Sequence, residues 1–210
     1  MELPHESWPK RADRPSVALP ADHLSRELIS VAVELFSQQG YYRTSVNDIL
    51  ARAHASKGGF YHHFESKEQM LVSIHDSFID YELATAKQIM LQVSGSAEQL
   101  RAVIFAHMES IETYQSYMNV FLQQAQDISE EAFAGIRQKR REYQQTLETI
   151  IRGCIDEGTF RQDVDPKLQA LLLIGMLNWA VHWYKPGAAW DISTIAAGVI
   201  NTLFHGLEKD

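Results

Sequence analysis

Apolar residues recur at spacings of three and four along nearly the whole chain, and this period constrains the fold more than any other feature. Alternating apolar runs flanked by turn dipeptides, which would indicate strands, are almost absent. The period therefore predicts an all-α protein. We expect helices over residues 23–39, 45–53, 57–63, 66–93, 97–113, 117–126, 130–157, 166–184 and 192–207.

Residues 1–21 lack that period and hold four of the six prolines together with mixed charges, so we expect a disordered N-terminal leader. They also lack the apolar core of about seven residues that a secretory signal peptide needs. No later stretch reaches the roughly 20 uncharged apolar residues of a membrane span. The single cysteine, Cys154, is expected to be a small buried apolar side chain, and its lack of a partner is typical of a cytoplasmic protein.

The formal net charge of -8 does not by itself indicate a nucleic-acid partner. The charge is unevenly distributed, because residues 1–75 carry 8 Lys and Arg against 9 Asp and Glu, whereas residues 76–210 carry 11 against 18. Within residues 40–67 there are 4 Lys and Arg against 2 Asp and Glu. The acidity therefore lies in the C-terminal two thirds, which leaves the N-terminal part as the candidate DNA-binding region.

The segment 45–64 has the size and apolar spacing of a helix-turn-helix, in which a tight turn joins two short helices. We expect Thr44 or Ser45 to cap the first short helix and Ser56 to cap the second. The free N–H groups at such helix starts, together with the capping hydroxyls, can also hold a DNA phosphate. These three residues are therefore candidate DNA contacts.

Two adjacent glycines, Gly58 and Gly59, stand inside the second short helix, where each costs about 1 kcal/mol relative to alanine. Close approach to a DNA major groove would explain that cost, because a residue without a side chain lets the backbone come near the base edges. The neighbouring side chains that can reach phosphates or bases are Lys57, Tyr61, His62, His63 and Lys67. A plain helical hairpin with a solvated histidine pair is the alternative.

Residues 36–70 are similar to the DNA-binding domain of TetR-type repressors. They carry its signature as Gly-Tyr-Tyr-Arg-Thr-Ser at 40–45, Ser-Lys-Gly-Gly-Phe-Tyr-His-His-Phe at 56–64 and Ser-Lys-Glu at 66–68. The resemblance implies that base edges are contacted by Lys57, Gly58 and Gly59. It implies that phosphates are held by Thr44, Tyr61, His62 and Lys67, and that the core contains Phe60 and Phe64.

The same resemblance implies the organisation of the whole chain. A three-helix DNA-binding domain would occupy residues 22–82, and a helical domain for ligand sensing and dimerisation would occupy residues 83–210. Such a protein is a homodimeric repressor that leaves a palindromic operator on double-stranded DNA when a small-molecule ligand fills its pocket.

The last two predicted helices indicate a dimer interface. Residues 168–181 leave almost no polar face, and the final helix carries a long apolar stripe at i, i+3, i+4 and i+7. One antiparallel pair from each of two subunits would bury both patterns in a four-helix interface, whereas the alternative is a monomer core built from the same residues. The interface residues that we expect are Leu173, Leu177, Trp190, Ile195, Val199, Ile200, Leu203 and Phe204.

An unusual aromatic stretch covers residues 175–187. It is similar to one in a TetR-type subgroup that controls fatty-acid and sterol degradation and senses acyl-CoA thioesters, in which Asn-Trp and Trp-Tyr-basic-Pro-Gly recur. An acyl-CoA needs an apolar tunnel for its chain and cations for its phosphates, whereas the alternative for these aromatic residues is a plain dimer core. The expected ligand contacts are Phe105, Met108, Phe121, Leu122, Met176, Asn178, Trp179, His182, Trp183 and Lys185.

These patterns together predict a ligand-responsive repressor that binds specific DNA sequences. Two alternatives stay open, namely a TetR-type regulator that senses an unrelated hydrophobic or aromatic effector, and a helical protein–protein adaptor without DNA binding. An enzyme is not expected, because the chain has no glycine-rich phosphate loop, nucleophile elbow or evident carboxylate pair. We also expect no metal site and no cofactor besides an effector.

Overall fold

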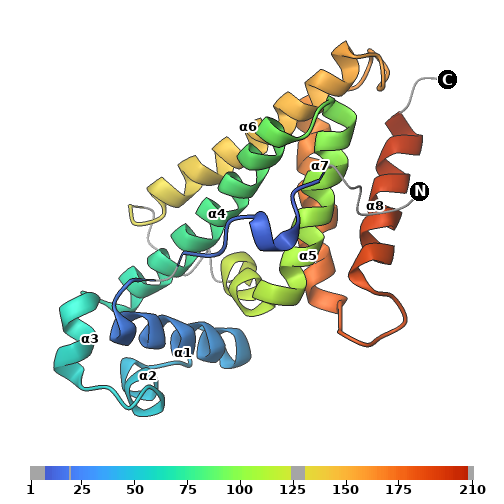
Figure 1. The fold of residues 1–210 in the computed structure, drawn as a ribbon. Coiled ribbons are helices and arrows are strands. Elements are labelled where there is room, and N and C mark those ends of the chain that lie inside the picture. The colour runs from blue at the N-terminus through green and yellow to red at the C-terminus, as the bar shows by residue number, and fades with distance from the viewer. Residues whose placement is uncertain (1–7, 19, 124–130, 208–210) are drawn as a thin grey trace. The chain divides into compact units, whose positions relative to one another are not determined.

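The computed structural model describes residues 8–18, 20–123 and 131–207, which form helices joined by loops (Figure 1). The helices are η1 (Arg11–Asp13, a short 3-10 helix), α1 (His23–Gln39), α2 (Val46–Arg52), α3 (Lys57–His63), α4 (Lys67–Gln92), α5 (Ser96–Gln123), α6 (Ala134–Asp156), α7 (Pro166–Trp183) and α8 (Ile192–Leu207). No strand occurs in these residues, so the all-α prediction is confirmed. Within the same ranges, no helix has the length and apolar character needed to cross a membrane.

The helix bounds differ from the predicted ones mainly in α5. The sequence predicts two helices there, whereas α5 is continuous and departs from helical geometry at Tyr114, with φ −126° and ψ 25°. The break between the predicted helices is therefore a kink. The predicted helix end at 124–126 and the predicted start of the next helix at 130 lie outside the described residues.

The described residues form two compact units. The N-terminal unit contains residues 16–18, 20–81, 114–123 and 131–139, and the C-terminal unit contains residues 8–15, 82–113 and 140–207. Helices α4, α5 and α6 each contribute to both units. The predicted division into domains after residue 82 stays a prediction, and the contacts additionally group residues 114–123 of α5 with α1, α2 and α3.

The N-terminal unit is held by an apolar core to which each short helix contributes. Phe36 of α1, Ile49 of α2 and Phe60 of α3 have no exposed surface, and the rings of Phe60 and Phe64 lie 5.7 Å apart. Burying a side chain of this size stabilises the fold by about 1.5–3 kcal/mol. The prediction that Phe60 and Phe64 belong to the core is confirmed.

In the C-terminal unit, α7 and α8 pack on each other and bury most of the residues predicted for a dimer interface. Those that are buried within the single chain are Leu173, Leu177, Ile200, Leu203 and Phe204. A helix that is apolar all round packs one side into its own chain and leaves the other side for a partner, so these five side chains keep little free surface, and their assignment to the subunit interface stays a prediction. The other predicted interface residues are half-buried or exposed, namely Ile195, Val199 and Trp190.

The opposite side of α7 is apolar and exposed, and we call it the α7 outer face. Its large side chains have exposed fractions between 43% and 66%, and they are Leu168, Leu171, Leu172, Trp179 and Trp183. A soluble chain rarely exposes so many large apolar residues on one helix without a partner surface. The exposed apolar residues of α7 are therefore different from the interface residues predicted on that helix.

The expected disordered leader is wrong for residues 8–18. Trp8 and Val17 are both only 6% exposed, and η1 lies between them along the chain. The segment contains too few apolar residues to show a period, but single large side chains are enough to anchor a short stretch against a helix.

Cys154 is buried on α6, as predicted. Burial raises the pKa of its thiol to about 12, with a smaller contribution from the nearby Glu157 carboxylate. The thiol is therefore neutral at ordinary pH, and its side chain fills the core as a small apolar group.

Candidate nucleic-acid interface

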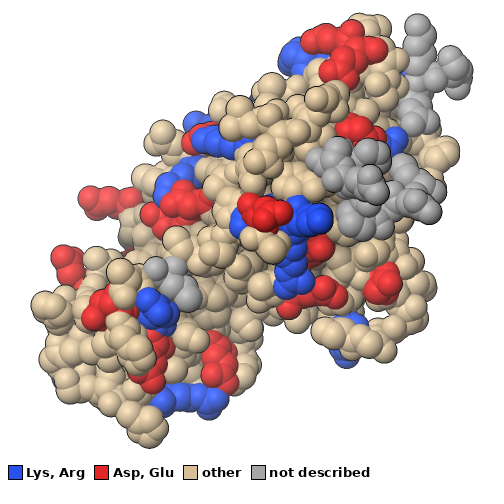
Figure 2. All heavy atoms as spheres, viewed as in Figure 1, with Lys and Arg blue, Asp and Glu red and all other residues tan. Residues whose placement is uncertain are grey.

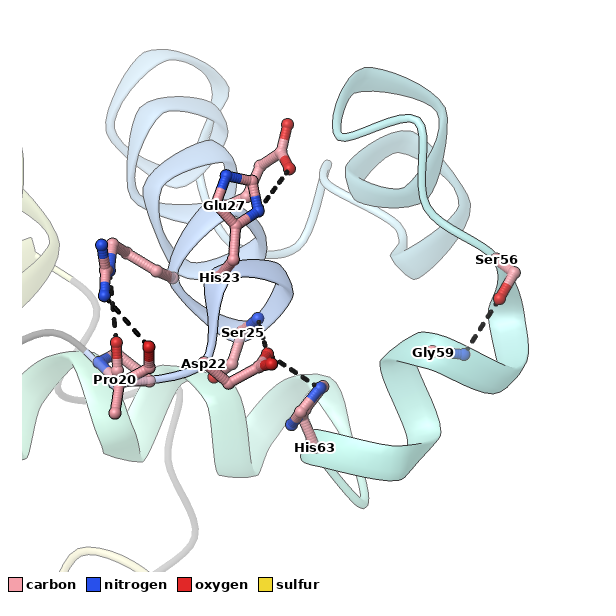
Figure 3. A network of polar contacts seen from close by, with 10 residues as sticks. Pro20, Asp22, His23, Ser25, Glu27, Ser56, Gly59 and His63 are labelled. Atoms are coloured by element: carbon pink, nitrogen blue, oxygen red, sulfur yellow. Dashed lines mark hydrogen bonds and ion pairs between the residues drawn. The ribbon is translucent and has the colours of Figure 1, made fainter.

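Helix α3 has one buried side and one exposed side. Ser56 caps it, accepting a hydrogen bond from the Gly59 N–H at 3.0 Å (Figure 3). The buried Phe60 anchors its inner side. The exposed residues are Lys57, Gly58, Tyr61 and His62, which follow one another at i, i+1, i+4 and i+5 and therefore share one face. This face has the size and chemistry of a surface that reads a DNA major groove.

Ser45 begins α2 with a reciprocal capping box. The Asp48 N–H donates to Ser45 Oγ at 3.1 Å, and the Ser45 N–H donates to Asp48 Oδ2 at 2.7 Å. The hydrogen bond from the Ser45 backbone is the main reason that the pKa of Asp48 is lowered from its usual value. The structure thus selects Ser45 over Thr44 as the cap, and it leaves Ser45 exposed at a helix start.

The Thr44 side chain is turned into the N-terminal unit, and its predicted role as a phosphate contact stays a prediction. Thr44 has no exposed surface, and its hydroxyl donates to the Gly40 carbonyl at 2.9 Å while accepting from Gln39 Nε2 at 3.1 Å. Both hydrogen bonds hold the turn between α1 and α2. The resemblance gives the position of Thr44 in the motif correctly but cannot give the direction in which its side chain points.

Lys67, at the start of α4, is engaged inside the N-terminal unit. Its ammonium donates to the carbonyl oxygens of Tyr41 and Thr44, at 2.8 Å each, and lies 3.9 Å from the centre of the Tyr41 ring. The structure therefore gives Lys67 an internal role, fixing the turn before α2, which the sequence did not predict. Its predicted role as a phosphate contact stays a prediction.

The two glycines of α3 have different surroundings. A Cβ added at Gly58 would meet nothing within 4 Å, whereas a Cβ at Gly59 would lie 2.9 Å from Leu24 Cδ2 of α1. Gly59 therefore lets α3 approach α1, and this internal contact explains its presence without DNA. At Gly58 the chain offers no internal reason for a glycine, which fits close approach by an outside molecule.

A further contact, missed in the sequence, ties the end of α3 to the start of α1. Asp22 caps α1 by accepting from the Ser25 N–H at 2.8 Å, and its Oδ2 also lies 3.1 Å from His63 Nε2 (Figure 3). The Ser25 hydrogen bond is the main reason that the pKa of Asp22 is lowered, and His63 lowers it further. No sequence pattern relates two residues so far apart, so only the fold reveals that His63 positions α3.

Charges on the N-terminal unit are mixed. Figure 2 shows Asp and Glu interspersed with Lys and Arg where α1 and α2 lie in Figure 1. Arg52 pairs with Glu34, and both side chains are about half exposed, so the pair neutralises one cation and adds little stability. Arg43 and Lys57 form no ion pair with any described residue and stay available to an anionic partner.

The ten predicted ligand contacts are divided between the two units, and their assignment to a ligand site stays a prediction. Phe121 and Leu122 belong to the N-terminal unit, whereas the other eight belong to the C-terminal unit. Within the latter, Phe105 and Met108 are buried, and the side chains exposed to solvent are Trp179, His182, Trp183 and Lys185. In the described part of the chain, no cluster of three His, Cys, Asp or Glu side chains can hold a metal ion.

Two protein-family models match the chain. One, described as "Bacterial regulatory proteins, tetR family", matches residues 28–74, and the other, described as "Tetracyclin repressor-like, C-terminal domain", matches residues 94–207, which is more than half of the chain. The chain belongs to the TetR family. It is a transcriptional regulator with the helix-turn-helix of that family, as residues 36–70 predict.

Relatives and solved structures agree with this assignment. The transcriptional repressor KstR2 of Rhodococcus jostii is 28% identical over 182 residues, which cover 86% of this chain and 89% of that protein. The structure of the ketosteroid transcriptional regulator KstR2 of Mycobacterium tuberculosis superposes with a TM-score of 0.84 at 26% identity, covering 93% of this chain and 100% of that one. AibR, solved with isovaleryl coenzyme A and operator DNA, has a TM-score of 0.78 at 27% identity, and the match covers 85% of this chain and 97% of that one.

The two glycines give a first test by substitution with alanine. We expect Gly58→Ala to raise the free energy of unfolding by about 1 kcal/mol, because alanine favours helix and its Cβ meets no atom. Gly59→Ala should gain less or lose stability, because Leu24 must shift. Denaturant unfolding of both variants measures the difference, and equal gains at the two positions would contradict the proposed packing role of Gly59.

Proposed function

We propose that this TetR-family chain is a homodimeric repressor that binds a palindromic operator through α3 and leaves it when a small-molecule effector binds. The observation that carries the proposal is the division of α3 into a side anchored by Phe60 and an exposed side with Lys57, Gly58 and Tyr61. Nothing in the described N-terminal unit covers that exposed side. We place its proposed site of action in the cytoplasm, at the nucleoid.

The DNA contacts that we propose follow from this division. Lys57 and Gly58 face base edges in the major groove, and Tyr61 and His62 reach phosphates beside it. The capped starts of α2 and α3, at Ser45 and Ser56, point free N–H groups to further phosphates. Gly59 and Lys67 act mainly by positioning the element, as the contacts described above support.

The α7 outer face supports the proposed dimer. Leu172 and Trp179 are seven residues apart and expose 52% and 66% of their surfaces, so a second copy of α7 can bury both. A two-fold dimer presents two copies of α3 to two half-sites of a palindrome. Because the local positive charge on each helix-turn-helix is small, tight binding of the dimer to the operator requires both half-sites together.

For the effector, we propose an acyl-CoA thioester. The support is the aromatic stretch 175–187 and the likeness to AibR, a protein solved with isovaleryl coenzyme A and operator DNA. His182 and Lys185 are exposed and are the proposed contacts for the phosphates. The effector acts by binding more tightly to a dimer whose two α3 helices no longer match successive major grooves.

Loss of operator binding by variants of α3 tests the proposed function. We expect Lys57→Ala and Tyr61→Ala each to weaken binding by at least about tenfold, because each removes a DNA contact from both half-sites. The operator is a fragment that the wild-type protein selects from genomic DNA, and binding is followed by fluorescence anisotropy. Lys87→Ala, which removes an exposed ion pair in the C-terminal unit, is the control and should bind as the wild type does. Unchanged affinity in both α3 variants would refute the DNA-reading role.

A charge placed on the α7 outer face tests the proposed dimer. Leu172→Glu should convert the protein to monomers at micromolar concentration, because a buried carboxylate without a partner is strongly destabilising at an interface. Sedimentation velocity measures the mass, and Gln145→Glu, on an exposed position of α6, is the matched control. A dimer that survives Leu172→Glu would place the interface elsewhere.

A further inference from the structure

Residues 8–15 form a strap that lies against helix α5 within the C-terminal unit. Trp8 is only 6% exposed, and its ring lies 5.6 Å from the ring of Phe105. The indole Nε1 donates a hydrogen bond to Glu98 at 3.2 Å. The strap therefore begins at a fixed aromatic anchor.

Two arginines hold the other end of the strap. Arg11 donates to the hydroxyl of Thr113 and lies 3.7 Å from the Glu112 carboxylate, and Arg14 pairs with Glu109. The Arg14 side chain is only 5% exposed, and its Nε has no hydrogen-bond partner among the described residues. This end of the strap is thus rich in positive charge and partly buried.

Between the strap and helices α4 and α5 there is a cavity of about 320 Å³. Its apolar lining includes Trp8 from the strap, Ile89 from α4, and Phe105 and Ala106 from α5. A volume of this size is at the lower end of the range for small-molecule sites, about 300–1,000 Å³. The cavity can therefore hold an apolar tail of moderate length.

The charged lining of the cavity favours an anion. Three cations, Lys10, Arg11 and Arg14, line it with a single carboxylate, Glu109. Arg11 and Arg14 already have acidic partners, whereas Lys10 is exposed and forms no ion pair with the described residues. Figure 2 shows Lys and Arg gathered beside Asp and Glu where η1 lies in Figure 1.

We propose that this cavity binds an amphipathic carboxylate, with its apolar tail against Trp8 and Phe105 and its carboxylate paired with Lys10. An apolar wall with a cation at its edge matches both ends of such a molecule. Of the residues proposed above for the acyl-CoA effector, the cavity shares only Phe105, so it is a separate site.

Calorimetric titration of the full-length protein with sodium octanoate, in the absence of DNA, tests the charged end of this site. We expect saturable binding of octanoate, with an affinity about fivefold lower for the Lys10→Gln variant. The neutral analogue 1-octanol should bind the wild-type protein more weakly than octanoate by a similar factor, because each change removes one charge from the same ion pair. Lys167→Gln, which changes an exposed lysine at the start of α7, should leave the affinity unchanged. No binding of octanoate, or equal affinity for octanol, would overturn the proposal.

Filling the cavity tests the apolar end independently. Ala106→Trp places an indole in the space of the tail and should weaken octanoate binding at least about tenfold, whereas Ala188→Trp, in an exposed loop, should not. Circular dichroism verifies the fold of both variants, and the Lys10 and octanol measurements decide the question if Ala106→Trp does not fold. Octanoate that binds folded Ala106→Trp as tightly as the wild type would also overturn the proposal. Because DNA is absent, a failure here leaves the proposed operator binding untouched.

Discussion

The ammonium of Lys67 is the contact on which the DNA-reading element depends. Its two hydrogen bonds to the carbonyls of Tyr41 and Thr44, and its place over the Tyr41 ring, join the start of α4 to the turn that leads into α2. Helices as short as α2 and α3 are not stable alone, so their positions are set by such contacts and by the core around Phe60. One partly buried lysine therefore fixes the geometry of a surface that it need not touch.

Further polar contacts of the N-terminal unit also hold its short helices in position. Ser45 and Ser56 cap α2 and α3, and Asp22 joins the start of α1 to His63 at the end of α3. The groups that hold these helices in place are thus bonded within the unit, whereas Lys57 and Tyr61 are turned outward without a fixed partner charge. This separation suits a protein that recognises a DNA sequence, because the outward side chains can adapt to the groove while the helix stays in place.

The local parts of this arrangement were predictable from the sequence, and the distant ones were not. The apolar period predicts α1, α3 and α8 closely, and hydroxyl residues before apolar runs predict the caps at Ser45 and Ser56, because these contacts join neighbouring residues. The strap was missed because Trp8 packs on Phe105, and no period relates residues so far apart. The same limit applies to α7, since an all-apolar helix does not reveal which side its own chain covers.

The salt dependence of operator binding by Lys67→Gln tests the positioning role of Lys67 most directly. Each phosphate that a protein neutralises contributes about −0.9 to the slope of log affinity against log salt concentration. If Lys67 acts by holding the turn before α2, the variant loses about tenfold in affinity but keeps the slope of the wild type. A slope that is shallower by about 1.8 for the dimer, which corresponds to one lost phosphate contact in each subunit, would contradict this account.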